Sequence, residues 1–253
     1  MSIINLSLDF NKLRQEFVNR EYKYITIDNF LADDVAEILY NGFKEITDNA
    51  LWYQAEYGRA RVFNKNLSEF DSNIYHFCFR YEMFPLKNHT LSQMLDSNIT
   101  RAGLYKVRQI DKNPEMEISY LNSVRKISHF LNSDEMHNLI SYITNTELTF
   151  GNLLAFASRY TSDDFLALHS DSPTNLETPR RIAFVLNMTK NWLVHWGGSL
   201  IILDESQKNI IEAINPKFNS LTLFKVPLKH AVLPVSCHCK SERLAITGWY
   251  QKS

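Results

Sequence analysis

The spacing of apolar and polar residues divides the chain into two parts, with the change near residues 145 to 150. In the first part, apolar residues recur at helical spacing over Leu31 to Ile46, over Ile118 to Leu131 and over Met136 to Ile143. The sequence therefore predicts three helices in this part.

Two strands are predicted among these helices. Tyr24 to Ile27 is a short β-branched and aromatic run that ends at the turn residues Asp28 and Asn29. From Tyr75 to Tyr81, aromatic side chains alternate with polar ones, which places the aromatic residues on one face of a strand. That face either packs against the rest of the fold or faces a substrate.

The second part reads as short strands separated by turn residues. The predicted strands are Leu148 to Tyr160, Arg181 to Met188, Ser199 to Leu203, Ile210 to Ile214, Ser220 to Val226, Ala231 to Val235 and Arg243 to Tyr250. Many short strands at regular spacing indicate a sandwich, jelly roll or barrel. We expect an α+β protein, in which a mixed α/β extension over residues 1–145 supports a β core over residues 146–253 in one structural unit.

Composition excludes several classes of protein. The 253 residues are 45% hydrophobic and 22% charged, and 27 basic residues nearly balance 28 acidic ones. This balance does not favour binding to nucleic acid. No apolar run approaches the roughly 20 residues of a membrane span, and charged residues interrupt the N-terminal segment where a signal peptide would lie. Three cysteines cannot form a full disulfide framework. We expect a cytoplasmic protein that binds no membrane.

The sequence His169-Ser170-Asp171 suggests a metal site. On an extended strand, residues two apart project to the same face, so His169 and Asp171 can converge on one point. A third ligand would come from His195, His230 or His238. Two histidines and one carboxylate form the facial triad of non-haem Fe(II) oxygenases. Such a pair by itself is more often a hydrogen-bonded surface pair than a metal site.

The segment Arg243 to Tyr250 has a second unusual pattern. If it is a strand, Arg243, Thr247 and Trp249 share one face. An inward-facing guanidinium needs an anionic partner, and a ligand carboxylate can supply it through a bidentate pair. If the opposite face is the buried one, Arg243 is a solvated residue at the edge of the sheet.

Five blocks of sequence, in order, resemble the catalytic domain of prolyl-hydroxylase-type Fe(II)/2-oxoglutarate dioxygenases. The resemblance runs from Phe156 to Tyr250 and is strongest to ribosomal and oxygen-sensing prolyl hydroxylases. The blocks are Tyr160 to Asp171, Arg181 to Trp192 with Trp196-Gly197-Gly198, Ile214 to Phe224, His230 to Val235, and Arg243 to Tyr250.

The resemblance implies a double-stranded β-helix, that is, a distorted jelly roll. It implies an iron ion held by His169, Asp171 and His230, and Arg243 binding the distal carboxylate of 2-oxoglutarate. It also implies that Thr247 and Trp249 line the same pocket, that Tyr160 is a further pocket residue, and that Asn187 takes the place of a tyrosine common in the family. The segment Cys237-His238-Cys239 lengthens the turn between His230 and Arg243 and is expected to be an ordinary loop.

The resemblance also implies the reaction. With Fe(II), 2-oxoglutarate and dioxygen, the family hydroxylates an aliphatic C–H and releases succinate and CO2, and L-ascorbic acid is associated with this activity. The expected substrate is a prolyl or other amino-acid side chain in a peptide or protein. Two alternatives remain open: a small-molecule or free amino-acid oxygenase with the same chemistry, through hydroxylation or desaturation, and a non-catalytic jelly-roll binding module.

Overall fold

The computed structural model describes residues 2–48, 53–57, 76–82, 127, 129–150, 153–171 and 179–252. Most of the predicted helix over Ile118 to Leu131 lies outside these residues, although residues 129–131 are helical. The side chains of the aromatic stretch from Tyr75 to Tyr81 also lie outside this description.

The described residues form three longer α-helices, one 3-10 helix and eleven strands. In chain order these are α1 (Phe10–Asn19), β1 (Tyr24–Ile27), α2 (Asp33–Asp48), β2 (Tyr53–Tyr57), β3 (His76–Glu82), α5 (Asp134–Thr144), β4 (Leu153–Tyr160), β5 (Phe165–His169), β6 (Arg180–Asn187), η2 (Val194–Trp196), β7 (Leu200–Leu203), β8 (Ile210–Ile214), β9 (Ser220–Lys225), β10 (His230–Val232) and β11 (Arg243–Gln251).

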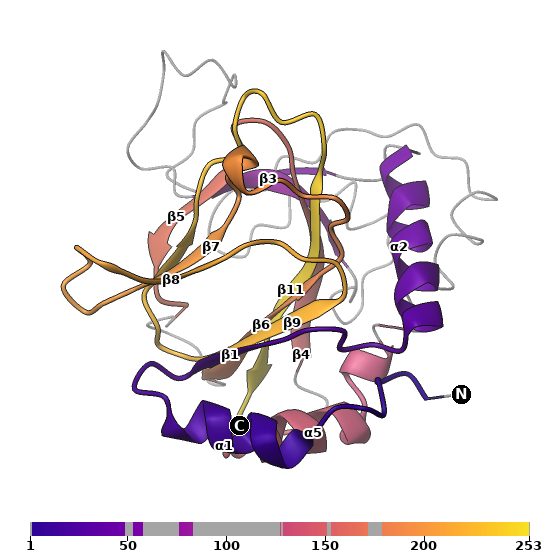
Figure 1. The fold of residues 1–253 in the computed structure, drawn as a ribbon, viewed down its shortest axis with the longest axis vertical. Coiled ribbons are helices and arrows are strands. Elements are labelled where there is room, and N and C mark those ends of the chain that lie inside the picture. Colours follow the sequence, from indigo (N-terminus) through magenta and orange to yellow (C-terminus); the bar gives the residue numbers. More distant parts are fainter. Residues whose placement is uncertain are drawn as a thin grey trace.

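The strands form one antiparallel sheet in the order β1-β9-β6-β11-β4-β3-β5-β10-β7-β8, with β2 paired to β3. The sheet folds over on itself: β1, β9, β6, β11 and β4 form one side, and β5, β10, β7 and β8 form the other (Figure 1). The predicted α+β architecture with a jelly-roll core is thus confirmed. None of the described helices is both long and apolar enough to cross a membrane.

The long side of the sheet buries both of its faces. Along β6, Ile182, Phe184 and Leu186 belong to one buried cluster, whereas Ala183 and Val185 belong to another. The first cluster contains residues of the helices and the second contains residues of β7 and β10. Alternate residues of each strand therefore face the helices or the interior of the jelly roll, as the period of two requires.

The helices α1 and α5 lie next to each other against the outer face of the sheet (Figure 1). Phe17 from α1 and Ile140 from α5 are both buried in the cluster on that face. The buried hydroxyl of Tyr250 on β11 donates a hydrogen bond to the backbone oxygen of Leu131, at 2.9 Å. The N-terminal part of the chain is thereby attached to the strand that begins with Arg243.

The helix α1, the strand β2 and the short helix η2 were not predicted from the sequence, and the residues of β5 were expected only as an extended segment carrying His169. The helix α1 begins at the N-cap Asp9, whose side chain accepts a hydrogen bond from the backbone N–H of Lys12. Its apolar residues are few, and only Phe17 is fully buried. A short helix with so narrow an apolar stripe is stabilised mainly by its contact with α5, which the local sequence does not specify.

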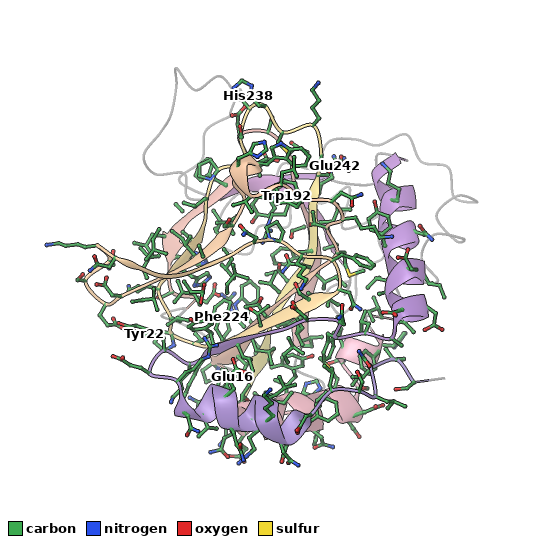
Figure 2. All side chains as sticks on the ribbon, in the orientation of Figure 1. Glu16, Tyr22, Trp192, Phe224, His238 and Glu242 are labelled. Atoms are coloured by element: carbon green, nitrogen blue, oxygen red, sulfur yellow. The ribbon has the colours of Figure 1, made fainter. Side chains whose placement is uncertain are left out.

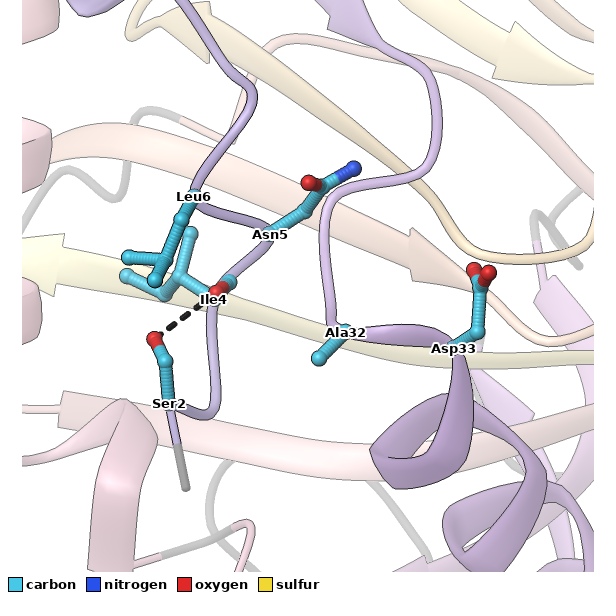
Figure 3. Close-up of a pocket in the computed structure, with 6 residues that line it drawn as sticks. All are labelled: Ser2, Ile4, Asn5, Leu6, Ala32 and Asp33. Carbon is cyan, nitrogen blue, oxygen red and sulfur yellow. Dashed lines mark hydrogen bonds between the residues drawn. The ribbon is translucent and has the colours of Figure 1, made fainter.

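A shallow hollow of about 330 Å³ lies where the N-terminal segment meets the start of α2 (Figure 3). Its lining residues are Ser2, Ile4, Asn5, Leu6, Ala32 and Asp33. None of the residues predicted for the metal or co-substrate site lines this hollow.

Candidate active site

The pairing of β5 with β10 brings His169 and His230 together. The two strands are antiparallel neighbours, and the two histidines lie directly opposite each other in their register. Their ring centroids are 4.1 Å apart. His169 is the last residue of β5 and His230 is the first of β10, so both imidazoles lie at the same end of the strand pair.

Asp171 reaches this pair through a turn and not along a strand. The strand β5 ends at His169, and Asp171 has a φ of 57°, in the left-handed region. The expectation that both residues project from one extended strand is therefore wrong, although their convergence is observed. The Asp171 carboxylate has one oxygen 3.1 Å from Nε2 of His169 and the other 3.4 Å from Nε2 of His230.

Both imidazoles are oriented by hydrogen bonds to the backbone. Nδ1 of His169 lies 2.9 Å from the oxygen of Ala167, and Nδ1 of His230 lies 2.8 Å from the oxygen of Leu228. A carbonyl oxygen only accepts, so in each neutral ring Nδ1 carries the proton and Nε2 presents a lone pair. Metal-ligating histidines commonly have this arrangement.

The three side chains therefore present acceptor atoms to one another. Two Nε2 lone pairs and a carboxylate repel each other unless a cation lies between them. The Nε2 atoms of His169 and His230 lie 3.1 and 3.4 Å from oxygens of Asp171, separations that two ligands of a single ion can have when their bonds are about 2.0–2.2 Å long. Two histidines and one carboxylate, leaving open positions, suit Fe(II). The residues present thus fit the implied metal.

The protonation states at neutral pH also suit a metal. Burial lowers the pKa of His230 from 6.5 to about 4, outweighing the opposite effect of the Asp171 charge. Burial raises the pKa of Asp171, but a hydrogen bond from His169 and the charges that His230 and His169 carry when acid protonates them outweigh it, so its pKa lies below the ordinary value. Asp171 is therefore ionised and His230 neutral, the forms in which these groups bind metals.

Arg243 is buried at the start of β11. It is only 2% exposed, so the alternative that it is a solvated edge residue is wrong. It pairs across the sheet with Tyr160 on β4, and its guanidinium carbon lies 5.0 Å from the centre of the Tyr160 ring. Ala245, two residues further along β11, belongs to the interior cluster, which places Arg243 on the interior face.

The interior face of β11 continues from Arg243 through Thr247 to Trp249, as predicted. Thr247 pairs with Val185 on β6 and with Phe156 on β4. Trp249 lies beside Asp171, where its indole contributes to the lowered pKa of that carboxyl. One face of a single strand thus runs from the buried guanidinium to a candidate metal ligand.

Asn187 lies on the same interior wall. It pairs with Ala245 on β11 and with Ser220 on β9, and it is buried. Its amide nitrogen lies 3.5 Å from the Ser220 hydroxyl oxygen, and its Oδ1 has no hydrogen-bond partner among the described residues. Because Asn187 lies opposite Ala245, and Arg243 is two residues before Ala245 on the same strand, Asn187 and Arg243 are diagonal neighbours on the interior face.

Arg180 is a site residue that was not predicted from the sequence. Its Nη1 lies 3.4 Å from the backbone oxygen of Asp171 and 3.9 Å from the Asp171 carboxylate. Its guanidinium carbon is 3.8 Å from the centre of the Trp249 ring, a cation–π contact. Nothing in the local sequence distinguishes Arg180 from its neighbour Arg181, which is exposed. Only the tertiary structure, which places the start of β6 beside Asp171, reveals the contact.

The other candidate histidines do not join the site. His195 lies in η2 against the ring of Trp196, and His238 is exposed at the end of the loop between β10 and β11 (Figure 2). Cys239 donates a hydrogen bond to the backbone oxygen of Ser241, and Cys237 is exposed. Among the described residues, the only group of three or more potential metal ligands is His169, Asp171 and His230.

One protein-family model matches the strand-rich part of the chain. Residues 155–251, from β4 to the end of β11, match the family model of the 2OG-Fe(II) oxygenase superfamily. Members of this family use Fe(II), 2-oxoglutarate and dioxygen.

Two vertebrate proteins have similar sequences. Prolyl 3-hydroxylase OGFOD1 of Mus musculus is 28% identical over 167 residues, which are 62% of this chain and 28% of that protein. The Xenopus laevis protein of the same name is 32% identical over 158 residues, or 58% of this chain and 28% of that protein. The match thus spans less than a third of the length of these relatives.

Solved structures show the same fold. A Pseudomonas putida prolyl-4-hydroxylase has a TM-score of 0.55 at 15% identity, covering 96% of this chain and 99% of that one. A Trichoplax adhaerens prolyl hydroxylase, in complex with a hypoxia-inducible-factor peptide fragment, has a TM-score of 0.59 at 18% identity, covering 96% and 90%.

Proposed function

We propose that this chain, whose residues 155–251 belong to the 2OG-Fe(II) oxygenase superfamily, is a hydroxylase that acts on an aliphatic C–H. The observation that carries the proposal is the convergence of His169, Asp171 and His230, with both Nε2 atoms facing the carboxylate. Three acceptor groups this close together are stable when a cation lies between them, which supports a bound metal ion.

Each of the three side chains has a defined part in holding the iron. His169 and His230 offer neutral Nε2 atoms, and their bonds to Ala167 and Leu228 keep the rings from rotating. Asp171 offers a charged oxygen and lowers the net charge of the site. When bound, Fe(II) with 2-oxoglutarate and dioxygen supplies the oxidation that converts a substrate C–H into C–OH, with release of succinate and CO2.

Arg243 would bind the distal carboxylate of 2-oxoglutarate. Its guanidinium can form two parallel hydrogen bonds with a carboxylate, and its burial strengthens that charge pair. Thr247 and Trp249 would line the co-substrate between Arg243 and the metal, with Tyr160 beneath the guanidinium. Asn187, diagonal to Arg243, would contribute to the same wall.

The proposed substrate is a prolyl or other amino-acid side chain in a peptide or protein. The relatives in mouse and frog are prolyl 3-hydroxylases, and the Trichoplax protein was solved with a peptide fragment. A free amino acid or small metabolite is the alternative substrate, and a comparison of product mixtures separates the two.

The deciding experiment measures turnover and product together. The protein is loaded with Fe(II) without oxygen, and succinate formed from 2-oxoglutarate is then measured in air, alone and with a proteome extract. We expect succinate and a peptide product heavier by about 16 Da, the mass of the oxygen atom that hydroxylation adds, with no product from His169→Ala. A protein that binds Fe(II) and 2-oxoglutarate but never forms succinate would instead be a binding module.

Three further assignments accompany this proposal. Residues 1–145 would support the catalytic unit of residues 146–253, because β1 pairs with β9 and because α1 and α5 pack on the outer face of the sheet.

The described cysteines, Cys237 and Cys239, are both free, which suits the reducing cytoplasm. L-ascorbic acid would sustain turnover by keeping the iron reduced, and omission of ascorbate from the assay tests this.

A further inference from the structure

The loop before β7 approaches the stem of Arg243 very closely. Gly197 and Gly198 have φ angles of 70° and 67°, a backbone region that side chains disfavour. A Cβ atom at Gly198 would lie 3.3 Å from Cδ of Arg243, 3.1 Å from Cζ2 of Trp192 and 3.2 Å from Cγ2 of Val235. The backbone of Gly198 therefore lies directly against the side chain of Arg243.

Trp192, which also lies against Gly198, is held in place by two contacts. Its indole Nε1 donates a hydrogen bond of 2.9 Å to the oxygen of Gly197. The ring of Trp196 meets it edge-on, with centroids 5.5 Å apart. Gly197 in turn forms an isolated bridge with Val235, and Gly198 donates to the oxygen of Pro234. The loop is thus bonded to the segment that follows β10.

At its other end, the Arg243 side chain meets Tyr160, whose ring centre is 5.0 Å from the guanidinium carbon. The stem is therefore confined at Cδ, one bond before the guanidinium group begins. Restriction at that atom sets the direction of the planar group, and bidentate carboxylate binding is sensitive to direction.

We infer that Gly198 and Trp192 are positioning residues that aim the Arg243 guanidinium at the co-substrate. The inference rests on the proposed function, since it assumes that Arg243 binds the distal carboxylate of 2-oxoglutarate. Gly198 has no side chain, so the aliphatic part of Arg243 can lie directly against its backbone. Trp192 packs on the loop and keeps it close to Arg243.

The test compares two ligands that differ in the distal carboxylate. Oxalate chelates a metal through two carboxylate oxygens but has no group to reach Arg243. Binding of 2-oxoglutarate and of oxalate to the Fe(II)-loaded full chain is measured by calorimetry without oxygen. Gly198→Ala should weaken 2-oxoglutarate binding about tenfold, the size of a coupling between neighbouring side chains, and leave oxalate binding within about twofold.

A second variant covers the case in which Gly198→Ala does not fold. Trp192→Phe removes both Cζ2 and the hydrogen bond to Gly197. It should weaken the binding of 2-oxoglutarate about threefold and leave the affinity for oxalate unchanged. The matched control is Val194→Ala, which shortens an exposed side chain of the same loop and should leave both affinities unchanged.

Two results would overturn the inference. If the soluble variants bind 2-oxoglutarate as tightly as the wild type, the loop does not position Arg243. If the variants lose affinity for oxalate and for 2-oxoglutarate equally, the loop stabilises the whole site and does not specifically orient Arg243. In either case a wild type that binds 2-oxoglutarate and forms succinate leaves the proposed function standing, whereas a wild type that does neither removes both.

Discussion

His169 and His230 lie directly opposite each other on β5 and β10, with their ring centroids 4.1 Å apart. The two residues are far apart in the sequence, so their meeting depends on the register of two strands. Since a slip of one residue would turn one imidazole to the other face of the sheet, the strand pairing itself defines the metal site.

Removal of a candidate ligand should abolish metal retention. We expect His169→Ala, Asp171→Ala and His230→Ala each to weaken Fe(II) affinity by more than roughly a hundredfold, beyond the effect of losing a supporting contact. Metal content after dialysis measures this, with Mn(II) as an air-stable probe. The matched control is His238→Ala, which removes an exposed imidazole outside the site. Normal metal content in the ligand variants would contradict the assignment.

Replacement of the buried guanidinium should separate the two binding functions. Arg243→Met should lower 2-oxoglutarate affinity by about 30- to 4,000-fold, because a buried charged hydrogen-bond pair is worth about 2–5 kcal/mol. Metal affinity should stay within a few-fold of the wild type, since Arg243 is not a ligand. Arg243→Lys should retain part of the affinity through its charge. Equal 2-oxoglutarate affinity in all three proteins would show that the co-substrate binds elsewhere.

The stability of the metal-free protein should fall as the pH is lowered. In the folded protein, burial lowers the pKa of His230 to about 4 from an ordinary 6.5. Between these values the unfolded chain binds a proton at this residue and the folded protein does not, so acid favours unfolding. The lowered pKa of Asp171 acts in the same direction at lower pH.

Denaturant unfolding of EDTA-treated protein, at a series of pH values from about 7.5 down to about 4.5, measures this dependence. His230→Asn should reduce the loss of stability over this range, because the substituted residue takes up no proton in either state. An identical pH dependence in the two proteins would exclude His230 as its source.

Loss of the contact between Arg180 and Asp171 should weaken metal binding without removing a ligand. We expect Arg180→Gln to lower Mn(II) affinity by about 10- to 100-fold, as for other residues that orient a metal ligand. Arg181→Gln, at the exposed neighbour, is the matched control. A rise in metal affinity would mean that the charge of Arg180 repels the ion more than its contacts hold Asp171 in place.

The hydrogen bond from Tyr250 on β11 to the backbone of Leu131 should contribute to the stability of the whole protein. Tyr250→Phe removes the hydroxyl that donates to Leu131 and leaves the ring in the core. The backbone oxygen of Leu131 then lacks this buried donor, so the free energy of unfolding should fall by about 1–3 kcal/mol. Metal and 2-oxoglutarate affinities should be unchanged. An unaltered midpoint in denaturant would show that the bond contributes nothing.

Local sequence indicated most strands of the core and every site residue described above except Arg180. The period of two along Arg243 to Tyr250 correctly placed Arg243, Thr247 and Trp249 on one face, because side-chain direction in a strand depends only on position along it. The turn signals around Gly197 and Gly198 were equally visible. The helix α1 was missed, because its stability comes from packing and not from its own residues.

The sequence by itself determined which side chains were available: two imidazoles, a carboxylate and a guanidinium that a β core could not bury without partners. The tertiary structure alone decided which of them meet. It placed His230 and not His195 or His238 opposite His169, turned Asp171 out of the strand towards both, and brought Arg180 back to Asp171. The physical reason is that strand register and chain reversal act between residues far apart in sequence, whereas periodicity reports only the residues nearby.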